Sequence, residues 1–170
     1  MQLRIIYDYC KELEPFIMFD AKLENGEIVS CVGHEWHCCD PKCKCYLTNI
    51  MVHDSDSGDR LAQIIYGWRN YEYYRKERFC KNEIKEFSSG YLSPIGPRNE
   101  HSTTILASFK LWLSSKREQK IKLFTERYKQ FKAFAKSKDF DEIADFKMFL
   151  YIINRLAKTG RLDELILKSE

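Results

Sequence analysis

The residues of this chain that are best suited to chemistry are the cysteines and histidines between positions 31 and 45. This stretch holds five of the seven cysteines and two of the four histidines. Disulfide frameworks usually spread their cysteines to close large loops, and the first residues show no basic segment followed by an apolar core. Reduced thiols that cluster so tightly are typical of metal ligands in a cytoplasmic protein. The sequence therefore predicts a metal site and a cytoplasmic location.

Three of these cysteines have the spacing of a zinc knuckle. Cys38, Cys43 and Cys45 can supply three thiolates from a tight turn, and the last two point to one face if the chain there is extended. Zinc takes about four soft or borderline ligands in a tetrahedron. We predict His34 as the fourth, because a neutral imidazole limits the negative charge of the site. Five other donors stay open for that position: His37, Cys39, Cys31, His53 and Cys80.

The stretch Cys38-Cys39-Asp40-Pro41-Lys42-Cys43-Lys44-Cys45 resembles the C-x-D-P-x-C-x-C signature of an uncharacterised family of small bacterial proteins. Later segments are similar to that family too, up to a helical C-terminal half. They are Leu61–Trp68, Asn99–Ser102 and Tyr128 with Phe131-Lys132. Members of the family usually have an acidic residue in place of Lys44 and an arginine in place of Tyr46. The resemblance implies the metal site and the layout of the chain, but no activity.

Other chemistry is less well supported by the residue pattern. His34-Glu35-x-His37 suggests a metalloprotease, yet that motif needs histidines four apart on a helix, and these are three apart. The aspartates of 54–59 start like a calcium loop but lack its terminal glutamate, so we interpret them as a solvated turn. The cysteines have two further interpretations, as buried thiols without metal and as a redox site. The sequence contains no Walker loop, dinucleotide-binding turn or serine nucleophile elbow.

The first half of the chain has the pattern of a small β-sheet that would position the cysteines. Asn25-Gly26 predicts a hairpin between 16–23 and 27–32, because both turn residues tolerate positive φ. Residues 46–53 and 61–68 predict two more strands; the second also has helical spacing, but its β-branched and aromatic residues favour a strand. A short helix is expected around 70–81. The aromatic run 68–74 is expected to pack the sheet against the later helices, with base stacking as the alternative.

The second half has the pattern of amphipathic helices. One apolar stripe begins near Ser102, and Ser115 with Glu118 suggests a capping box for a second helix. Asp139 and Glu142 suggest the start of a third helix, and 162–167 predict a short fourth one. Residues 98–138 contain 11 basic and 3 acidic residues. Such a basic stretch could bind nucleic-acid phosphates, but a solvated helix face is the simpler interpretation.

Together these patterns predict an α+β protein, in which a small antiparallel β-sheet with a cysteine-rich zinc knuckle is packed by about four C-terminal helices. We divide it into a β-rich knuckle region, 1–97, and a helical region, 98–170, that packs on it as one unit. With 170 residues, 44% hydrophobic and 31% charged, and only short apolar runs, the chain predicts no membrane segment.

The predicted function is a non-catalytic interaction module with a structural zinc ion and an unidentified protein partner. Two alternatives remain. One is nucleic-acid binding through the basic helices of 98–138, and the other is a metal-dependent hydrolase with an open position on the zinc.

Overall fold

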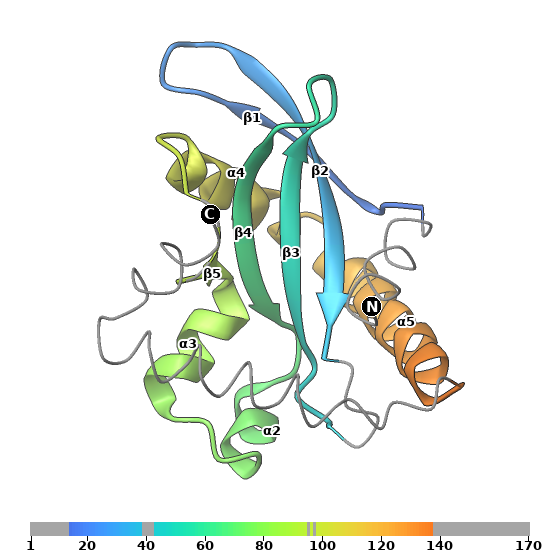
Figure 1. Ribbon diagram of the computed structural model, residues 1–170. Helices are drawn as coiled ribbons and strands as arrows, with labels where there is room; N and C mark the ends of the chain where they lie inside the picture. Colours follow the sequence, from blue (N-terminus) through green and yellow to red (C-terminus); the bar gives the residue numbers. More distant parts are fainter. Residues whose placement is uncertain (1–13, 39–42, 95, 97, 138–170) are drawn as a thin grey trace, which may run out of the picture.

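Five antiparallel strands form the centre of the structure, a computed structural model that describes residues 14–38, 43–94, 96 and 98–137. The strands are β1 (Ile17–Lys22), β2 (Ile28–His37), β3 (Leu47–Asp54), β4 (Arg60–Gly67) and β5 (Tyr91–Leu92). They follow one another across the sheet in chain order, so each pairs with its neighbour in the sequence (Figure 1). The predicted antiparallel sheet and the α+β class are confirmed.

The predicted hairpin at Asn25-Gly26 is confirmed as the β1–β2 turn. Gly26 has a φ of 86°, and the Asn25 side chain accepts a hydrogen bond of 3.0 Å from the Glu27 backbone N–H. The strand that follows is longer than its expected end at residue 32, since it continues to His37. This extension brings the cysteine motif directly onto the end of the central strand pair.

Buried residues alternate with more exposed ones along β2 and β3, and this gives the sheet two different faces. On β2, residues 29, 31, 33, 35 and 37 are buried, while the intervening positions are exposed or half-buried. On β3, Thr48, Ile50 and Val52 are buried and form the same face, because the register places Gly33 opposite Val52 and Glu35 opposite Ile50. This period of two follows from the pleat. We call the buried side the helix face and the other side the second face.

Two short helices connect β4 to β5, where a single helix was expected. They are α2 (Tyr71–Lys76) and α3 (Lys81–Ser89). The Asn70 side chain caps α2 by accepting the Tyr73 N–H at 2.9 Å. Arg78 then takes a left-handed φ of 68°, which no helix can continue through, and the Glu83 carboxylate accepts the Cys80 N–H at the start of α3. The prediction of one helix was wrong because this break has no glycine or proline to mark it.

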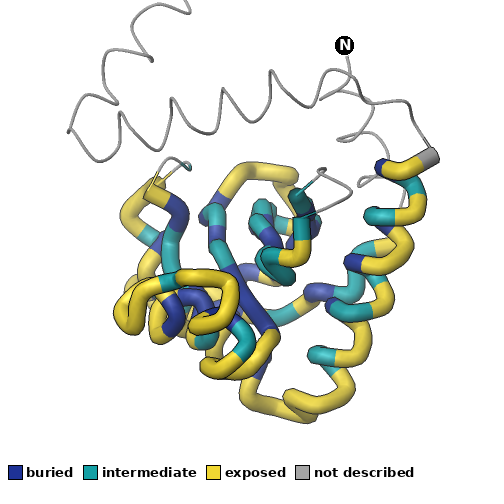
Figure 2. The backbone as a smooth tube through the Cα atoms, turned by 90° about the horizontal axis from the view of Figure 1, so that it is seen from below, coloured by how far each residue is buried: buried dark blue, intermediate teal, exposed yellow. Residues whose placement is uncertain are grey.

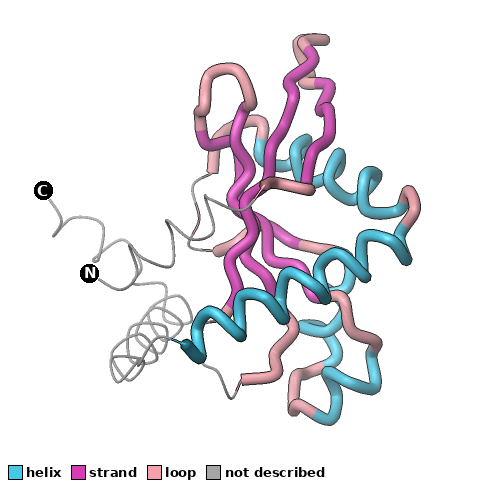
Figure 3. Tube along the Cα trace, turned by 90° about the vertical axis from the view of Figure 1, so that its right-hand side faces the viewer, coloured by secondary structure: helices cyan, strands magenta, loops and turns pink. Residues whose placement is uncertain are grey.

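Helices α4 (Ser102–Ser114) and α5 (Arg117–Ser137) cover the helix face of the sheet (Figures 1 and 3). Aromatic side chains fill the space between the layers: Phe109 lies 5.9 Å from Tyr66, and Phe124 stacks on Trp68 at 5.5 Å between ring centroids. The Trp68 Nε1–H donates to the Thr125 hydroxyl at 3.1 Å. Figure 2 shows buried positions along the strands and the inner sides of the helices. Aromatic burial of this kind supplies much of a core's stabilisation.

The turn between α4 and α5 differs in detail from its predicted capping box. The Ser115 hydroxyl donates to the Trp112 carbonyl at 2.8 Å, and Lys116 takes a left-handed φ of 49°. The Lys120 ammonium donates back to the Trp112 carbonyl and, at 2.6 Å, to the Ser115 carbonyl. A lysine therefore satisfies the last carbonyls of α4, which is a favourable place for a cation.

The helices predicted from Asp139 onward lie outside the described residues, and α4 and α5 are the C-terminal helices within them. Within the part of the chain that is described, no helix combines the length and the apolar character needed to cross a membrane.

Candidate metal centre

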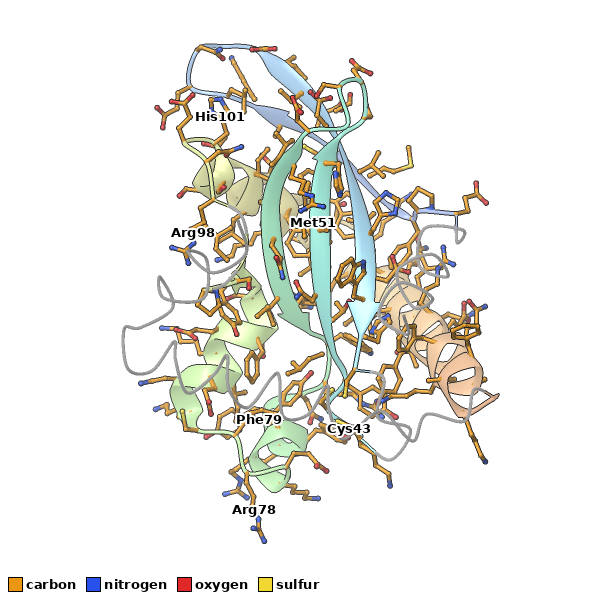
Figure 4. The ribbon with its side chains drawn as sticks, viewed as in Figure 1. Cys43, Met51, Arg78, Phe79, Arg98 and His101 are labelled. Carbon is orange, nitrogen blue, oxygen red and sulfur yellow. The ribbon has the colours of Figure 1, made fainter. Side chains whose placement is uncertain are left out.

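The three predicted cysteine ligands come together where β2 ends and β3 begins. The sulfur atoms of Cys38, Cys43 and Cys45 all lie within 4.8 Å of one another. The antiparallel register explains this, because His37 at the end of β2 is opposite Thr48 near the start of β3. In Figure 4, Cys43 lies at this end of the sheet, close to α2. Two thiolates on a tetrahedral zinc are about 3.8 Å apart when each Zn–S bond is about 2.3 Å, so the cluster could hold a metal ion.

The thiol groups of this cluster form hydrogen bonds with one another. Hydrogen bonds from the Cys38 and Cys45 thiols lower the pKa of Cys43, and a hydrogen bond from the Cys45 backbone N–H lowers it further. Hydrogen bonds to Cys38 and Cys43, together with burial, raise the pKa of Cys45. One thiolate is thus stabilised by two neighbouring thiols. A metal ion would take the place of the thiol protons, since it binds the deprotonated form.

Side chains from α5 and α2 hold the backbone of the knuckle. The Tyr128 hydroxyl donates to the Cys43 carbonyl at 2.8 Å, and the Lys132 ammonium donates to the Cys38 carbonyl at 2.7 Å. From α2, the Tyr73 hydroxyl donates to the Lys44 carbonyl at 2.5 Å. These bonds satisfy three carbonyl groups of the connection between β2 and β3, so the sulfurs are positioned by two helices as well as by the sheet.

Tyr46 closes the knuckle in a strained backbone conformation. Its φ is 48°, in the left-handed region that residues with a Cβ rarely adopt. Its ring stacks on Tyr128 at 4.5 Å between centroids, the Arg69 guanidinium lies 4.2 Å from the ring centroid, and its carbonyl accepts the Tyr74 hydroxyl at 2.9 Å. The surrounding contacts hold the turn that sends the chain from Cys45 into β3.

The predicted fourth ligand, His34, lies elsewhere on the sheet. It is on the second face of β2, with its ring 5.7 Å from that of His53, and it does not belong to the group of three sulfurs. Cys31 is buried on the helix face, where burial raises its pKa to about 12. Cys80 is exposed at the start of α3. Cys39 lies outside the described residues.

His37 is the histidine nearest to the cysteines in the chain, and it lies in an aromatic environment. Its ring is 5.6 Å from those of Tyr128 and Phe131 and 5.8 Å from that of Trp68. Only 7% of the residue is exposed, and burial lowers its pKa to about 3. The imidazole is therefore neutral at physiological pH, and it packs β2 against α5 directly below the knuckle.

Glu35, which the hydrolase hypothesis would use, forms an ion pair within the structure. The residue is 5% exposed, and its carboxylate lies 3.2 Å from the Arg127 Nε atom on α5. Burial raises the pKa of Glu35, and the Arg127 charge opposes that shift. Arg127 also donates to the Glu14 carbonyl. The pair connects β2 to α5, and this geometry gives no support to a role for Glu35 as a general base.

The aspartate-rich turn satisfies its own polar groups. The Asp54 carboxylate accepts the Asp56 N–H at 2.8 Å and the Ser57 hydroxyl at 3.1 Å, and these bonds lower its pKa. This is the arrangement of a self-bonded turn between β3 and β4, in agreement with the interpretation from sequence.

The supporting residues Tyr73, Lys132 and Arg127 were not identified from the residue pattern. Lys132 looked like part of a solvated basic face, and Tyr73 like part of an aromatic core run. Each bonds to a backbone or side-chain group that is 29 to 113 positions away in the chain. Residue spacing predicts which side chains share a face of one helix or strand. It cannot predict contacts between residues that are far apart in the sequence.

Comparison of the chain with protein-family models, with curated proteins and with solved structures gave no match. The resemblance of its cysteine motif to a bacterial family therefore stays a prediction.

Proposed function

We propose that this protein binds one zinc ion through Cys38, Cys43 and Cys45, and that the ion has a structural role in a non-catalytic interaction module. The observation that supports the proposal most directly is the approach of three sulfurs to within 4.8 Å from two separate stretches of chain. Thiolate ligands select soft or borderline ions, and zinc is the usual occupant of tetrahedral thiolate sites. The described residues offer three ligands, so the tetrahedron has one further position.

The contacts around the site favour a structural role. Helix α5 bonds to both sides of the knuckle, through Tyr128 on Cys43 and Lys132 on Cys38. An ion at the sulfurs would therefore connect β2, β3 and α5 at one point. Metal binding of this kind contributes to the free energy of folding, because the unfolded chain has no preformed site.

The test compares two cysteine-to-serine variants of the purified protein. Cys43→Ser removes one of the clustered sulfurs, whereas Cys80→Ser changes an exposed cysteine outside the cluster. We expect about one zinc per chain in the wild type and in Cys80→Ser, and a large loss of zinc in Cys43→Ser, by elemental analysis. Cobalt substitution should give sulfur-to-metal charge-transfer absorption in the first two proteins alone. Full zinc content in Cys43→Ser would contradict the proposal.

Nucleic-acid binding through α5 is the second candidate. Lys122, Lys129 and Lys136 are exposed and seven residues apart, which places them on one side of the helix about 10.5 Å from one another. The other cations of this helix include three that bond internally, namely Lys120, Arg127 and Lys132. Salt-dependent retention on DNA that disappears when the three exposed lysines become glutamine would support this function. Retention that is absent at low salt would exclude it.

A further inference from the structure

A pair of histidines lies on the second face of the sheet, away from the cysteine cluster. His34 on β2 is directly opposite Met51 on β3, and His53 is two residues further along β3 on the same face. The two imidazole rings are 5.7 Å apart between centroids, at an angle of 74°. Both residues are half-buried. Figure 4 shows Met51 in the middle of β3, well away from Cys43 at the end of the sheet.

The hydrogen bonding of His53 prepares one of its nitrogens for a metal. Its Nδ1 atom is 3.1 Å from the Gly58 carbonyl oxygen. A carbonyl oxygen can only accept, so Nδ1 is the donor in this bond and Nε2 is the nitrogen left to bind a metal. A histidine that ligates a metal usually donates its other ring N–H to a carbonyl or carboxylate in this way. The turn after β3 therefore sets both the tautomer and the orientation of the ring.

The donors gathered at this position have a consistent chemistry. Two imidazoles from neighbouring strands lie on the same face of the sheet as Met51, which is opposite His34 in the register. Imidazole is the preferred side chain for first-row ions such as Ni²⁺, Cu²⁺ and Zn²⁺. An ion between the rings would be about 2.0–2.1 Å from each ligating nitrogen, which is compatible with two edge-to-face rings whose centroids are 5.7 Å apart.

We propose that His34 and His53 form a second metal site, for a divalent first-row ion, that is independent of the cysteines. His34 is three residues before the end of β2, a distance of about 10 Å along an extended strand, so one ion cannot use both sets of ligands. Solvent completes the coordination of the ion. Two of the three histidines that are candidate ligands of the zinc knuckle by sequence thus have a role of their own.

The test uses the zinc-loaded protein and Ni²⁺, whose paramagnetism broadens the NMR signals of nearby nuclei. The chain has four histidines, which serve as internal reporters. One equivalent of Ni²⁺ should broaden the imidazole signals of His34 and His53 and leave those of His37 and His101 sharp, with the zinc content unchanged. Figure 4 shows His101 beside the start of α4, the helix that covers the helix face, so it is not on the second face with His34 and His53. Equal broadening of His101, or no broadening of the pair at millimolar Ni²⁺, would overturn the proposal.

Variants give a second measurement by calorimetry. His34→Asn and His53→Asn should each weaken Ni²⁺ binding at least tenfold, while the matched surface change His101→Asn should leave it unchanged. Cys43→Ser should also retain the Ni²⁺ site, which separates this proposal from the zinc knuckle. Unchanged affinity in both His34→Asn and His53→Asn, with folding verified by circular dichroism, would show that the ion binds elsewhere.

Discussion

At the scale of single residues, the structure depends on polar side chains that are buried between β2 and α5. Glu35 and Arg127 form the clearest pair, with 5% and 16% of their side chains exposed. Removing one member of a buried ion pair leaves an uncompensated charge, which is more costly than losing an exposed pair. The pair therefore fixes how α5 lies along the sheet.

Replacing Arg127 by leucine should lower the free energy of unfolding by about 3 kcal/mol at pH 7. Burial already raises the pKa of Glu35, and the loss of the Arg127 charge raises it further. A carboxyl pKa that is raised in the folded state means that stability falls as pH rises through that pKa. The free energy of unfolding that Arg127→Leu loses should consequently be smaller at pH 5 than at pH 7. Urea denaturation at both pH values measures this.

Two variants control the Arg127 experiment. Arg117→Leu changes an exposed arginine of the same helix and should have little effect on stability. Adding Glu35→Gln to Arg127→Leu should recover part of the loss at pH 7, since it removes the buried charge. Arg127 would act through packing alone if the loss of unfolding free energy were the same at both pH values and Glu35→Gln did not reduce it.

At the scale of elements, α5 holds the knuckle through the Tyr128 hydroxyl. Tyr128→Phe keeps the ring that stacks on Tyr46 and removes only the bond to the Cys43 carbonyl. We expect a loss of about 1 kcal/mol in unfolding free energy and a faster release of zinc to a chelator. Tyr71→Phe, on the exposed side of α2, is the matched control and should release zinc at the wild-type rate. Equal rates in all three proteins would contradict a role for this hydroxyl.

Strand β4 and helix α2 meet at Gly67, where there is no room for a side chain. A Cβ atom at this position would lie 2.5 Å from the Tyr74 hydroxyl oxygen and 2.7 Å from Leu47 Cδ2. Gly67→Ala should therefore displace Tyr74, whose hydroxyl bonds to the Tyr46 carbonyl, and cost about 2 kcal/mol in stability. Thermal denaturation measures the loss. Gly58→Asn, in an open turn with a φ of 76°, should cost much less, and an equal cost would refute the steric argument.

At the scale of the whole molecule, the proposed zinc ion joins the sheet to its helical layer at one end. The knuckle lies between β2 and β3, and the core formed by the strands with α4 and α5 lies on the helix face. By its composition, which includes Asp40, Pro41, Lys42 and Lys44, the connection between these strands has few apolar side chains. The ion should thus matter most for the pairing of β2 with β3.

A strong chelator should lower the melting temperature and first increase hydrogen exchange in residues 28–53. The reason is that release of a structural ion removes its binding free energy from the folded state. The aromatic core between the sheet and α4 should keep its protection longer, since it does not involve the cysteines. Cys43→Ser should resemble the chelated protein. Unchanged melting and unchanged exchange after chelation would argue against a structural ion.

The sequence by itself determined the local features of this protein. The hairpin at Asn25-Gly26 follows from turn chemistry and the helix from Ser102 follows from periodicity. The strand predicted at 61–68, which the structure has at 60–67, follows from its β-branched and aromatic residues. All three signals act over a few residues. The cysteine motif was also visible, because its three sulfurs are within eight positions. Residue patterns were less reliable for α2 and α3, because Arg78 takes a left-handed backbone conformation that divides the predicted helix.

Only the tertiary structure decided which distant side chains meet. It placed His34 beside His53 instead of with the cysteines, paired Glu35 with Arg127, and brought Tyr128 and Lys132 onto the knuckle carbonyls. The physical reason is that strand alternation sends neighbouring residues to opposite faces, so closeness in sequence does not imply a shared site. Register and helix packing set those contacts, and both depend on the whole core at once.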